Sequence, residues 1–153
     1  MRDVPSDIGE LQAEFDDSVC RLIEASDKYE VLDRNMSDDP FEPDIVVMTE
    51  DEWIFRMVCW YQSEEDDGFV NIYPRTFGMR KWVTDHDDEP TFFIMGLGGT
   101  PQHPERFFLT RFDKIYDSFI EIDYLKKFEL TLFRFDFIYN AVNHELCRVF
   151  SPE

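Results

Sequence analysis

The chain has 153 residues, of which 43% are hydrophobic and 16% aromatic, and this composition excludes intrinsic disorder over most of its length. Its 34 acidic and 15 basic residues give a net charge of -19, which repels a phosphate backbone and makes nucleic acid an unfavourable partner. Three scattered cysteines without a C-x-x-C pair, and no leader-like N-terminal run, predict reduced thiols and a cytoplasmic location. The apolar stretches are too short to cross a membrane.

The acidity decreases along the chain. Residues 1–50 carry 15 acids and 4 bases, whereas residues 101–153 carry 9 acids and 7 bases. The acidic clusters lie between apolar segments, which is typical of solvated loop tips. The alternative is an acidic face that binds a basic partner or imitates nucleic acid. The last third holds bases that we interpret as ordinary surface charges, with a local basic patch as the alternative: Arg106, Arg111, Lys114, Lys126 and Lys127.

The first predicted elements are a helix, a short strand and a hairpin. A strand is expected over residues 29–32. Two β-branched and aromatic segments, 45–48 and 53–61, flank an acidic turn at 49–52 and predict the hairpin. The helix precedes them, and its apolar stripe steps by three and four residues through Ile8, Leu11, Phe15, Val19, Leu22 and Ile23.

Further along, a second helix is predicted over Phe77–Val83, and the wholly apolar segment 91–97 predicts a strand covered on both faces. The glycine-rich residues 96–100 predict a sharp turn rather than a phosphate-binding loop, because Pro101 and Pro104 follow. A strand is expected over 105–112, and periodicity leaves 115–128 undecided. A final strand is predicted from the alternation of Phe133, Phe135 and Phe137.

Recognised catalytic spacings are scarce. The histidines His86, His103 and His144 lack the spacing of a zinc site, and there is no G-x-S-x-G motif. Four segments nevertheless fall in an order that resembles a known family. They are Phe15-Asp-Asp-Ser-Val19, Pro43-Asp44, the strand 55–63, and the strand 91–97 with its following Gly98-Gly-Thr-Pro-Gln-His-Pro-Glu105.

Over about residues 9–125 the chain resembles the restriction-endonuclease-like superfamily with the PD-(D/E)XK signature, in particular its small bacterial domains; the segment after the apolar strand is the most specific part. The resemblance implies that residues 1–153 form one such α/β domain, with a central mixed β-sheet flanked by helices. It also implies a Mg²⁺ site with two carboxylates that activates water to attack a phosphodiester, assisted by a lysine.

Residue by residue, the resemblance places Asp16 at the helix acid and Asp44 at the first metal acid. Val58 stands at the second acid, Trp60 at the lysine and Gln62 at the basic residue that follows. The missing carboxylate leaves a cation short of an oxygen ligand, and the missing lysine removes a proton-transfer group typically worth about 10²- to 10⁴-fold in rate.

Val58 and Trp60 are expected to share one strand face and to fill the former catalytic pocket. No catalytic residue and no cofactor are therefore expected, and Asp44 and Asp16 are the metal ligands if any Mg²⁺ site survives. The alternative is that the missing groups have migrated, with Lys81 as the base and Glu52 or Glu64 as the carboxylate.

Three functions follow from these expectations. The first is a catalytically degenerate nuclease-like protein that acts as a binding or regulatory module for a protein partner with a basic surface. The second is an acidic inhibitor or immunity-type protein that occupies the basic site of a nucleic-acid enzyme. The third is a Mg²⁺-dependent nuclease with a rearranged site. Adaptation to high salt is a further explanation of the charge.

Overall fold

A computed structural model describes residues 4–34, 43–72, 83 and 89–150, without the side chains of residues 4–9. It begins with α1 (Val4–Glu24), which confirms the predicted first helix. The stripe residues Phe15, Val19 and Ile23 are fully buried, as expected of one apolar face at helical spacing. The predicted helix Phe77–Val83, with Lys81, and His86 lie outside the described residues apart from Val83.

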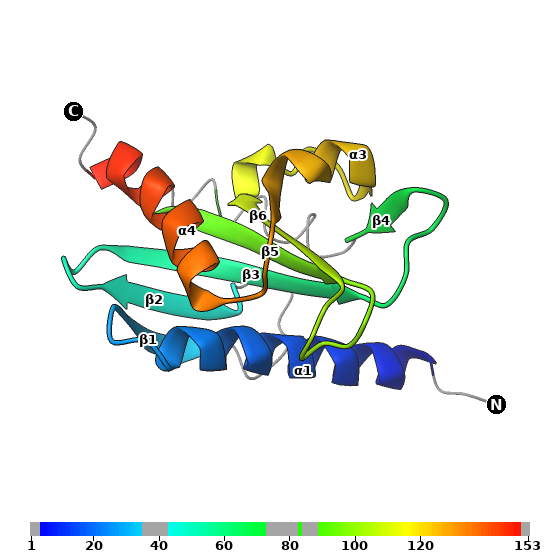
Figure 1. Cartoon of the computed structure of the whole chain (residues 1–153), viewed down its shortest axis with the longest axis horizontal. Coiled ribbons are helices and arrows are strands. Elements are labelled where there is room, and N and C mark those ends of the chain that lie inside the picture. Colours follow the sequence, from blue (N-terminus) through cyan, green and yellow to red (C-terminus); the bar gives the residue numbers. More distant parts are fainter. Residues whose placement is uncertain (1–3, 35–42, 73–82, 84–88, 151–153) are drawn as a thin grey trace.

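Six strands form one mixed sheet in the order β1-β2-β3-β5-β6-β8 (Figure 1). β3 and β5 are parallel, and the other neighbouring pairs are antiparallel. Two further strands, β4 (Phe69–Asn71) and β7 (Phe119–Glu121), form a separate antiparallel pair. The strands of the main sheet are β1 (Tyr29–Arg34), β2 (Ile45–Thr49), β3 (Ile54–Gln62), β5 (Thr91–Leu97), β6 (Arg106–Arg111) and β8 (Glu129–Leu130).

Most of the predicted strands are confirmed. β2 and β3 form the expected hairpin around the acidic turn, and all seven residues of β5 are buried, as predicted for a strand covered on both faces. The glycine-rich segment after β5 is a turn into antiparallel β6. Gly98 and Gly99 have φ values of 75° and 62° there, a conformation that L side chains rarely adopt.

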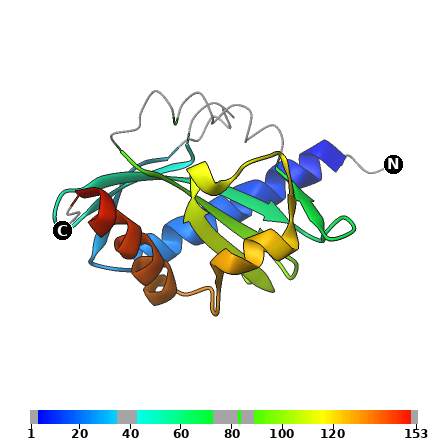
Figure 2. The same cartoon turned by 90° about the horizontal axis from the view of Figure 1, so that it is seen from above.

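The main sheet separates two apolar layers (Figures 1 and 2). On one face, α1 and α4 (Phe135–Phe150) pack against sheet residues such as Phe55, Cys59 and Ile94. On the other face, the β4–β7 pair and a short helix, α3 (Ile122–Leu125), cover residues such as Val58 and Phe93. This arrangement confirms the expected class, an α/β structure with a central mixed sheet flanked by helices.

The predicted final strand through Phe133 and Phe137 is wrong, because α4 begins at Phe135. The helix buries Ile138, Val142 and Leu146, whose spacing of four follows the helical period. Phe133 lies just before the helix and stacks on the Phe15 ring at a centroid distance of 5.9 Å. The alternating phenylalanines therefore lie on both sides of the helix start, with Phe133 before α4 and Phe137 within it.

The segment that periodicity left undecided is a chain of short elements. It contains the 3₁₀ turn η1 (Phe112–Lys114), β7, α3 and the 3₁₀ turn η2 (Lys126–Phe128), which leads into β8. Elements of three or four residues are too short to establish a period. In the part of the chain that the structure describes, no helix is long and apolar enough to cross a membrane.

Candidate functional site

The site lies where β3 extends beyond its partner β2. The backbone N–H of Asp44, just before β2, donates to the Met57 carbonyl oxygen. Two residues further along β3, side chains take the place of the missing strand: Asp44 Oδ2 accepts the Cys59 N–H at 2.7 Å. The Gln12 amide, from α1, accepts the Tyr61 N–H at 2.9 Å and donates to the Tyr61 carbonyl oxygen. These bonds satisfy backbone groups that would otherwise be costly to bury.

Three potential ligand groups meet beside this edge. A carboxylate oxygen of Asp16 from α1, one of Asp44 and the Cys59 Sγ from β3 lie within 4.8 Å of one another. Phe15 and Val19, both fully buried, hold this part of α1 against the sheet. Asp16 faces the sheet and its Oδ1 is buried. The structure therefore brings the two predicted acids, Asp16 and Asp44, together.

The approach of α1 depends on Gly96 of β5. A Cβ atom at Gly96 would lie 2.9 Å from Phe15 Cε1 and 3.1 Å from Pro104 Cβ. Nearby, the Tyr61 hydroxyl donates towards the carbonyl oxygens of Gly98 and Gly99, each at 3.0 Å. Burial raises the pKa of Tyr61, so the phenol stays protonated and fastens β3 to the glycine turn.

The expected place of Val58 and Trp60 needs a correction. They do share one face of β3, but Val58 is fully buried in the layer covered by β4 and β7, and Trp60 packs against that layer. Side chains alternate along a strand, so the residues that face α1 and the acids are Cys59 and Tyr61. Val58 and Trp60 therefore do not fill the pocket beside Asp44.

Gln62, the last predicted position, also points away from the acids. Its amide donates to the Glu64 carbonyl oxygen at 2.7 Å and accepts the Asn71 N–H at 3.2 Å. Gln62 thus connects the end of β3 to the following loop and to β4, which is a structural role.

Sequence reasoning missed Gln12, Cys59 and Tyr61. β3 is apolar on both faces, with Phe55, Met57, Val58 and Cys59 all buried, so no alternation of polar and apolar residues revealed which side chains face α1. The sequence held only an indirect signal. If a helix acid and a strand acid share a site, the side chains of the neighbouring strand that line this site must lie on the helix side of the sheet.

The cluster meets only part of the Mg²⁺ site that the resemblance implies. Two carboxylates are a usual protein share of a magnesium site, with water completing the octahedral shell, but here the third group is a thiol and one Asp44 oxygen already accepts the Cys59 N–H. Sulfur is a ligand of softer ions such as Zn²⁺. No magnesium-dependent step is assigned to these residues.

The proposed migrated groups are also absent from the described part of the site. Glu52 lies in the β2–β3 turn, at the opposite end of β2 from Asp44, and Glu64 is exposed beyond β3. Lys81 lies outside the described residues. The described lysines belong to other parts of the fold: Lys28 before β1, Lys114 in η1, and Lys126 and Lys127 in η2.

Comparisons with known proteins find no matching family model and no matching curated protein. Among solved structures, one similar chain is that of Hjc, a Holliday junction resolvase from the archaeal hyperthermophile Archaeoglobus fulgidus. It is 11% identical, the match covers 73% of this chain and 91% of that chain, and the TM-score is 0.48.

Proposed function

We propose that this chain is a catalytically degenerate restriction-endonuclease-like protein that binds a partner protein with a basic surface. The supporting observation is the state of Asp44. Its carboxylate is engaged by the Cys59 backbone, and the third group of its cluster is a thiol. In the described part of the chain, β3 supplies no carboxylate to this cluster, and no lysine ammonium from a neighbouring element stands beside it to assist a water nucleophile.

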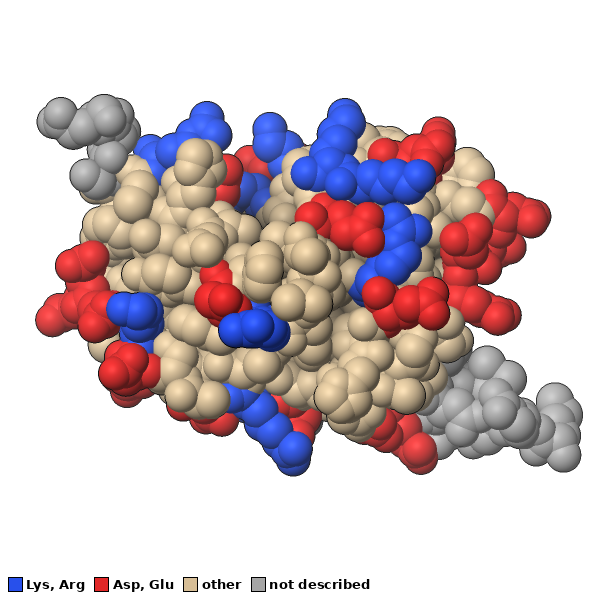
Figure 3. Space-filling model, in the orientation of Figure 1, with Lys and Arg blue, Asp and Glu red and all other residues tan. Residues whose placement is uncertain are grey.

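Charge supports a basic partner. Acidic residues line the left and right margins of the face in Figure 3, in keeping with the net charge of -19. The loop between β3 and β4 contributes four consecutive exposed acids, Glu64, Glu65, Asp66 and Asp67. A field of this sign accelerates encounters with positively charged proteins and excludes acidic ones.

The β4–β7 pair next to that loop supplies apolar anchors. Its inner residues Val70 and Ile120 are fully buried, whereas Phe69 is 39% and Phe119 is 53% exposed. Exposed aromatic side chains ringed by charge are typical of the residues that dominate binding at protein interfaces. We place the contact with the basic partner on this outer face of β4 and β7.

The loss of hydrolysis is tested with the whole chain on single-stranded, duplex and branched DNA and on RNA, in Mg²⁺, Mn²⁺ and Zn²⁺. Asp44→Asn is the best control, because an asparagine oxygen can still accept the Cys59 N–H. We expect no cleavage beyond that of Asp44→Asn. Cleavage by the wild type that disappears in Asp44→Asn would overturn the proposal in favour of a nuclease with a rearranged site.

Binding is tested by immobilising the chain and identifying the proteins that it retains from extracts of its source at about 150 mM salt. The Phe69→Ser/Phe119→Ser double variant is compared with Leu132→Ser, which removes an equally exposed side chain (45%) before α4. We expect basic proteins that the wild type and Leu132→Ser retain and the double variant loses. Equal retention by all three, or no basic protein, would count against the assigned face.

A further inference from the structure

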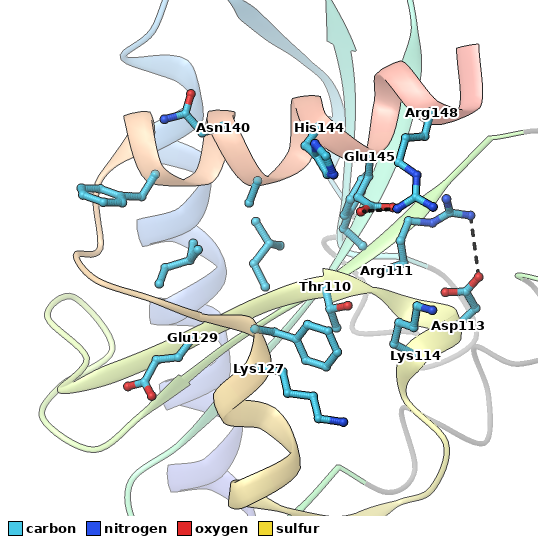
Figure 4. Close-up of a pocket in the computed structure, with 16 residues that line it drawn as sticks. Thr110, Arg111, Asp113, Lys114, Lys127, Glu129, Asn140, His144, Glu145 and Arg148 are labelled. Atoms are coloured by element: carbon cyan, nitrogen blue, oxygen red, sulfur yellow. Dashed lines mark ion pairs between the residues drawn. The ribbon is translucent and has the colours of Figure 1, made fainter. Parts of the chain in front are cut away.

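A pocket of about 720 Å³ opens beside the β6–β8 edge of the main sheet, and β3 and β5 lie between β6 and β2 in the sheet order. Its walls come from β6, η1, η2 with β8, and α4 (Figure 4). None of its lining residues belongs to α1, β2 or β3. The volume is in the range of sites that enclose small organic molecules, and the proposed function leaves this pocket unused.

The pocket gathers positive charge in a strongly negative protein. Four of the chain's 15 basic residues line it, namely Arg111, Lys114, Lys127 and Arg148. Figure 4 shows Arg111, Lys114 and Lys127 on the sheet side and His144 and Arg148 on α4. Of the bases that sequence analysis singled out, Arg106 and Lys126 do not line the pocket, and they form ion pairs with Glu129 and Asp123.

The acids that line the pocket do not form ion pairs with its two lysines. Asp113 pairs with Arg111 at 3.8 Å, and Glu145 pairs with Arg148 at 3.6 Å. The third acid, Glu129, accepts two hydrogen bonds from Arg106, outside the pocket, at 2.8 and 2.9 Å. In the described part of the chain, Lys114 and Lys127 have no carboxylate within ion-pair distance; the Lys127 ammonium lies 4.8 Å from the centre of the Tyr124 ring.

Arg111 adds a guanidinium to these lysines. Its side chain lines the pocket and is 25% exposed, with one terminal nitrogen 3.8 Å from Asp113. Guanidinium and ammonium groups together are the usual ligands of phosphate oxygens.

Apolar side chains form the rest of the pocket. Phe92 and Leu109 are almost fully buried beneath it, and the half-buried rings of Phe128 and Phe137 stand at its sides. A ligand that fills the pocket therefore needs a flat apolar part as well as a negative one, because burial of apolar surface and stacking on rings add to the charge contacts.

We propose that this pocket binds a nucleotide, with the phosphates at Lys114, Lys127 and Arg111 and the base against Phe128 and Phe137. The net charge of -19 opposes non-specific uptake of anions by the rest of the surface. Binding of a nucleotide would therefore be specific to this pocket, and this proposal is independent of the state of Asp44.

The test is calorimetric titration of the whole chain with ATP, adenosine and tripolyphosphate, with EDTA present to exclude divalent metals. We expect ATP to bind more tightly than either fragment. Lys127→Gln should weaken ATP binding about tenfold, as expected for one charge-assisted contact. Lys126→Gln is the matched control, because it removes the same charge one residue away while Lys126 pairs with Asp123 at 3.1 Å; it should change the affinity less than twofold.

Three results would overturn the proposal. The first is the absence of detectable ATP binding at about 10 mM ATP, because a dissociation constant above this concentration is too weak for a specific site of this size. The second is an equal loss of affinity in Lys126→Gln and Lys127→Gln, which would indicate a diffuse electrostatic effect. The third is tripolyphosphate binding as tightly as ATP. That result would show that the pocket binds anions and that the aromatic rings do not contribute to the affinity.

Discussion

Asp44 and Gln12 complete the hydrogen bonding of β3 where β2 stops, so the residue that most resembles a nuclease acid has a structural task. The sequence motif was sufficient to predict that Asp16 and Asp44 meet, because a helix acid and a Pro-Asp before a strand have fixed places in such a fold. It was insufficient to predict that Cys59, rather than Val58, joins them. A strand that is buried on both faces carries no polar alternation to define its register.

The cysteines give a prediction at this scale. Cys20 and Cys59 are 1% and 3% exposed, whereas Cys147 is exposed. Burial, opposed in part by Arg34, raises the pKa of Cys20 to about 11, which suppresses its reactive thiolate. We expect a disulfide reagent at pH 8 to modify one thiol rapidly in the native chain and three in denaturant. Cys147→Ser should abolish the rapid reaction, and a rapid reaction that survives in this variant would contradict the burial described here.

The elements with a regular hydrophobic period were predicted correctly, whereas the elements whose structure depends on tertiary contacts were not. α1, the β2–β3 hairpin and β5 each show their period over several residues. α4 was mistaken for a strand because aromatic residues alternate with charged ones across its start. Phe135 belongs to an aromatic cluster, with its ring centroid 5.6 Å from that of Tyr139, whereas Phe137 lines the pocket. The short elements β7, α3 and β8 depend on distant partners, which no local pattern reveals.

Packing of α1 on β5 is tested by Gly96→Ala. The new Cβ would clash with Phe15 Cε1 and crowd Pro104, so we expect the free energy of unfolding to fall by about 1–3 kcal/mol. Urea denaturation gives the value. Phe15→Leu removes the clashing ring atom, so the double variant should lose less stability than the sum of the two single losses. Strict additivity would show that the two residues are not in contact.

The contact between β6 and β8 gives a pH-dependent prediction. Hydrogen bonds from Arg106 lower the pKa of the Glu129 carboxyl below its ordinary value of 4.5. A lowered folded-state pKa stabilises the fold above the ordinary pKa, and this stability is lost as the pH falls through the lowered value.

Glu129→Gln should therefore reduce the free energy of unfolding by about 0.5–1 kcal/mol at pH 7, and the difference should shrink as the pH is lowered. Urea denaturation at a series of pH values measures it. Glu121→Gln, an exposed acid on β7, is the control and should show little change. A difference between Glu129→Gln and the wild type that persists at the lowest pH would rule out the ion pair as its cause.

The whole molecule combines a negative surface with one positive pocket. Figure 3 shows basic side chains gathered above the centre of this face and acids towards its margins. Composition predicted the excess of acids, and the sequence offered a local basic patch in the last third as an alternative. Which bases share the pocket depends on η1, η2 and α4 coming together, and so it appears only in the folded chain. The negative charge that repels anions from most of the surface distinguishes the pocket, because the pocket gathers basic side chains.

Self-repulsion predicts that salt stabilises the chain. Raising NaCl from about 10 mM to about 0.5 M shortens the screening length several-fold, so the melting temperature should rise by several degrees. KCl at equal ionic strength should have the same effect, because screening does not depend on the identity of the ion. A steep loss of stability at low salt would favour adaptation to high salt, and a flat profile would show that the acids are too far apart to interact.

The pairing of β4 with β7 has a consequence for the order of folding. β4 ends at Asn71 and its partner begins at Phe119, so during synthesis the chain must extend well past β6 before this layer can close. Until then Val58, Phe93, Met95 and Phe108, which are 0–1% exposed in the folded chain, remain uncovered on one side of the sheet. A nascent or truncated chain that ends before β7 would therefore present a hydrophobic sheet face, which is a target for chaperones and a cause of aggregation.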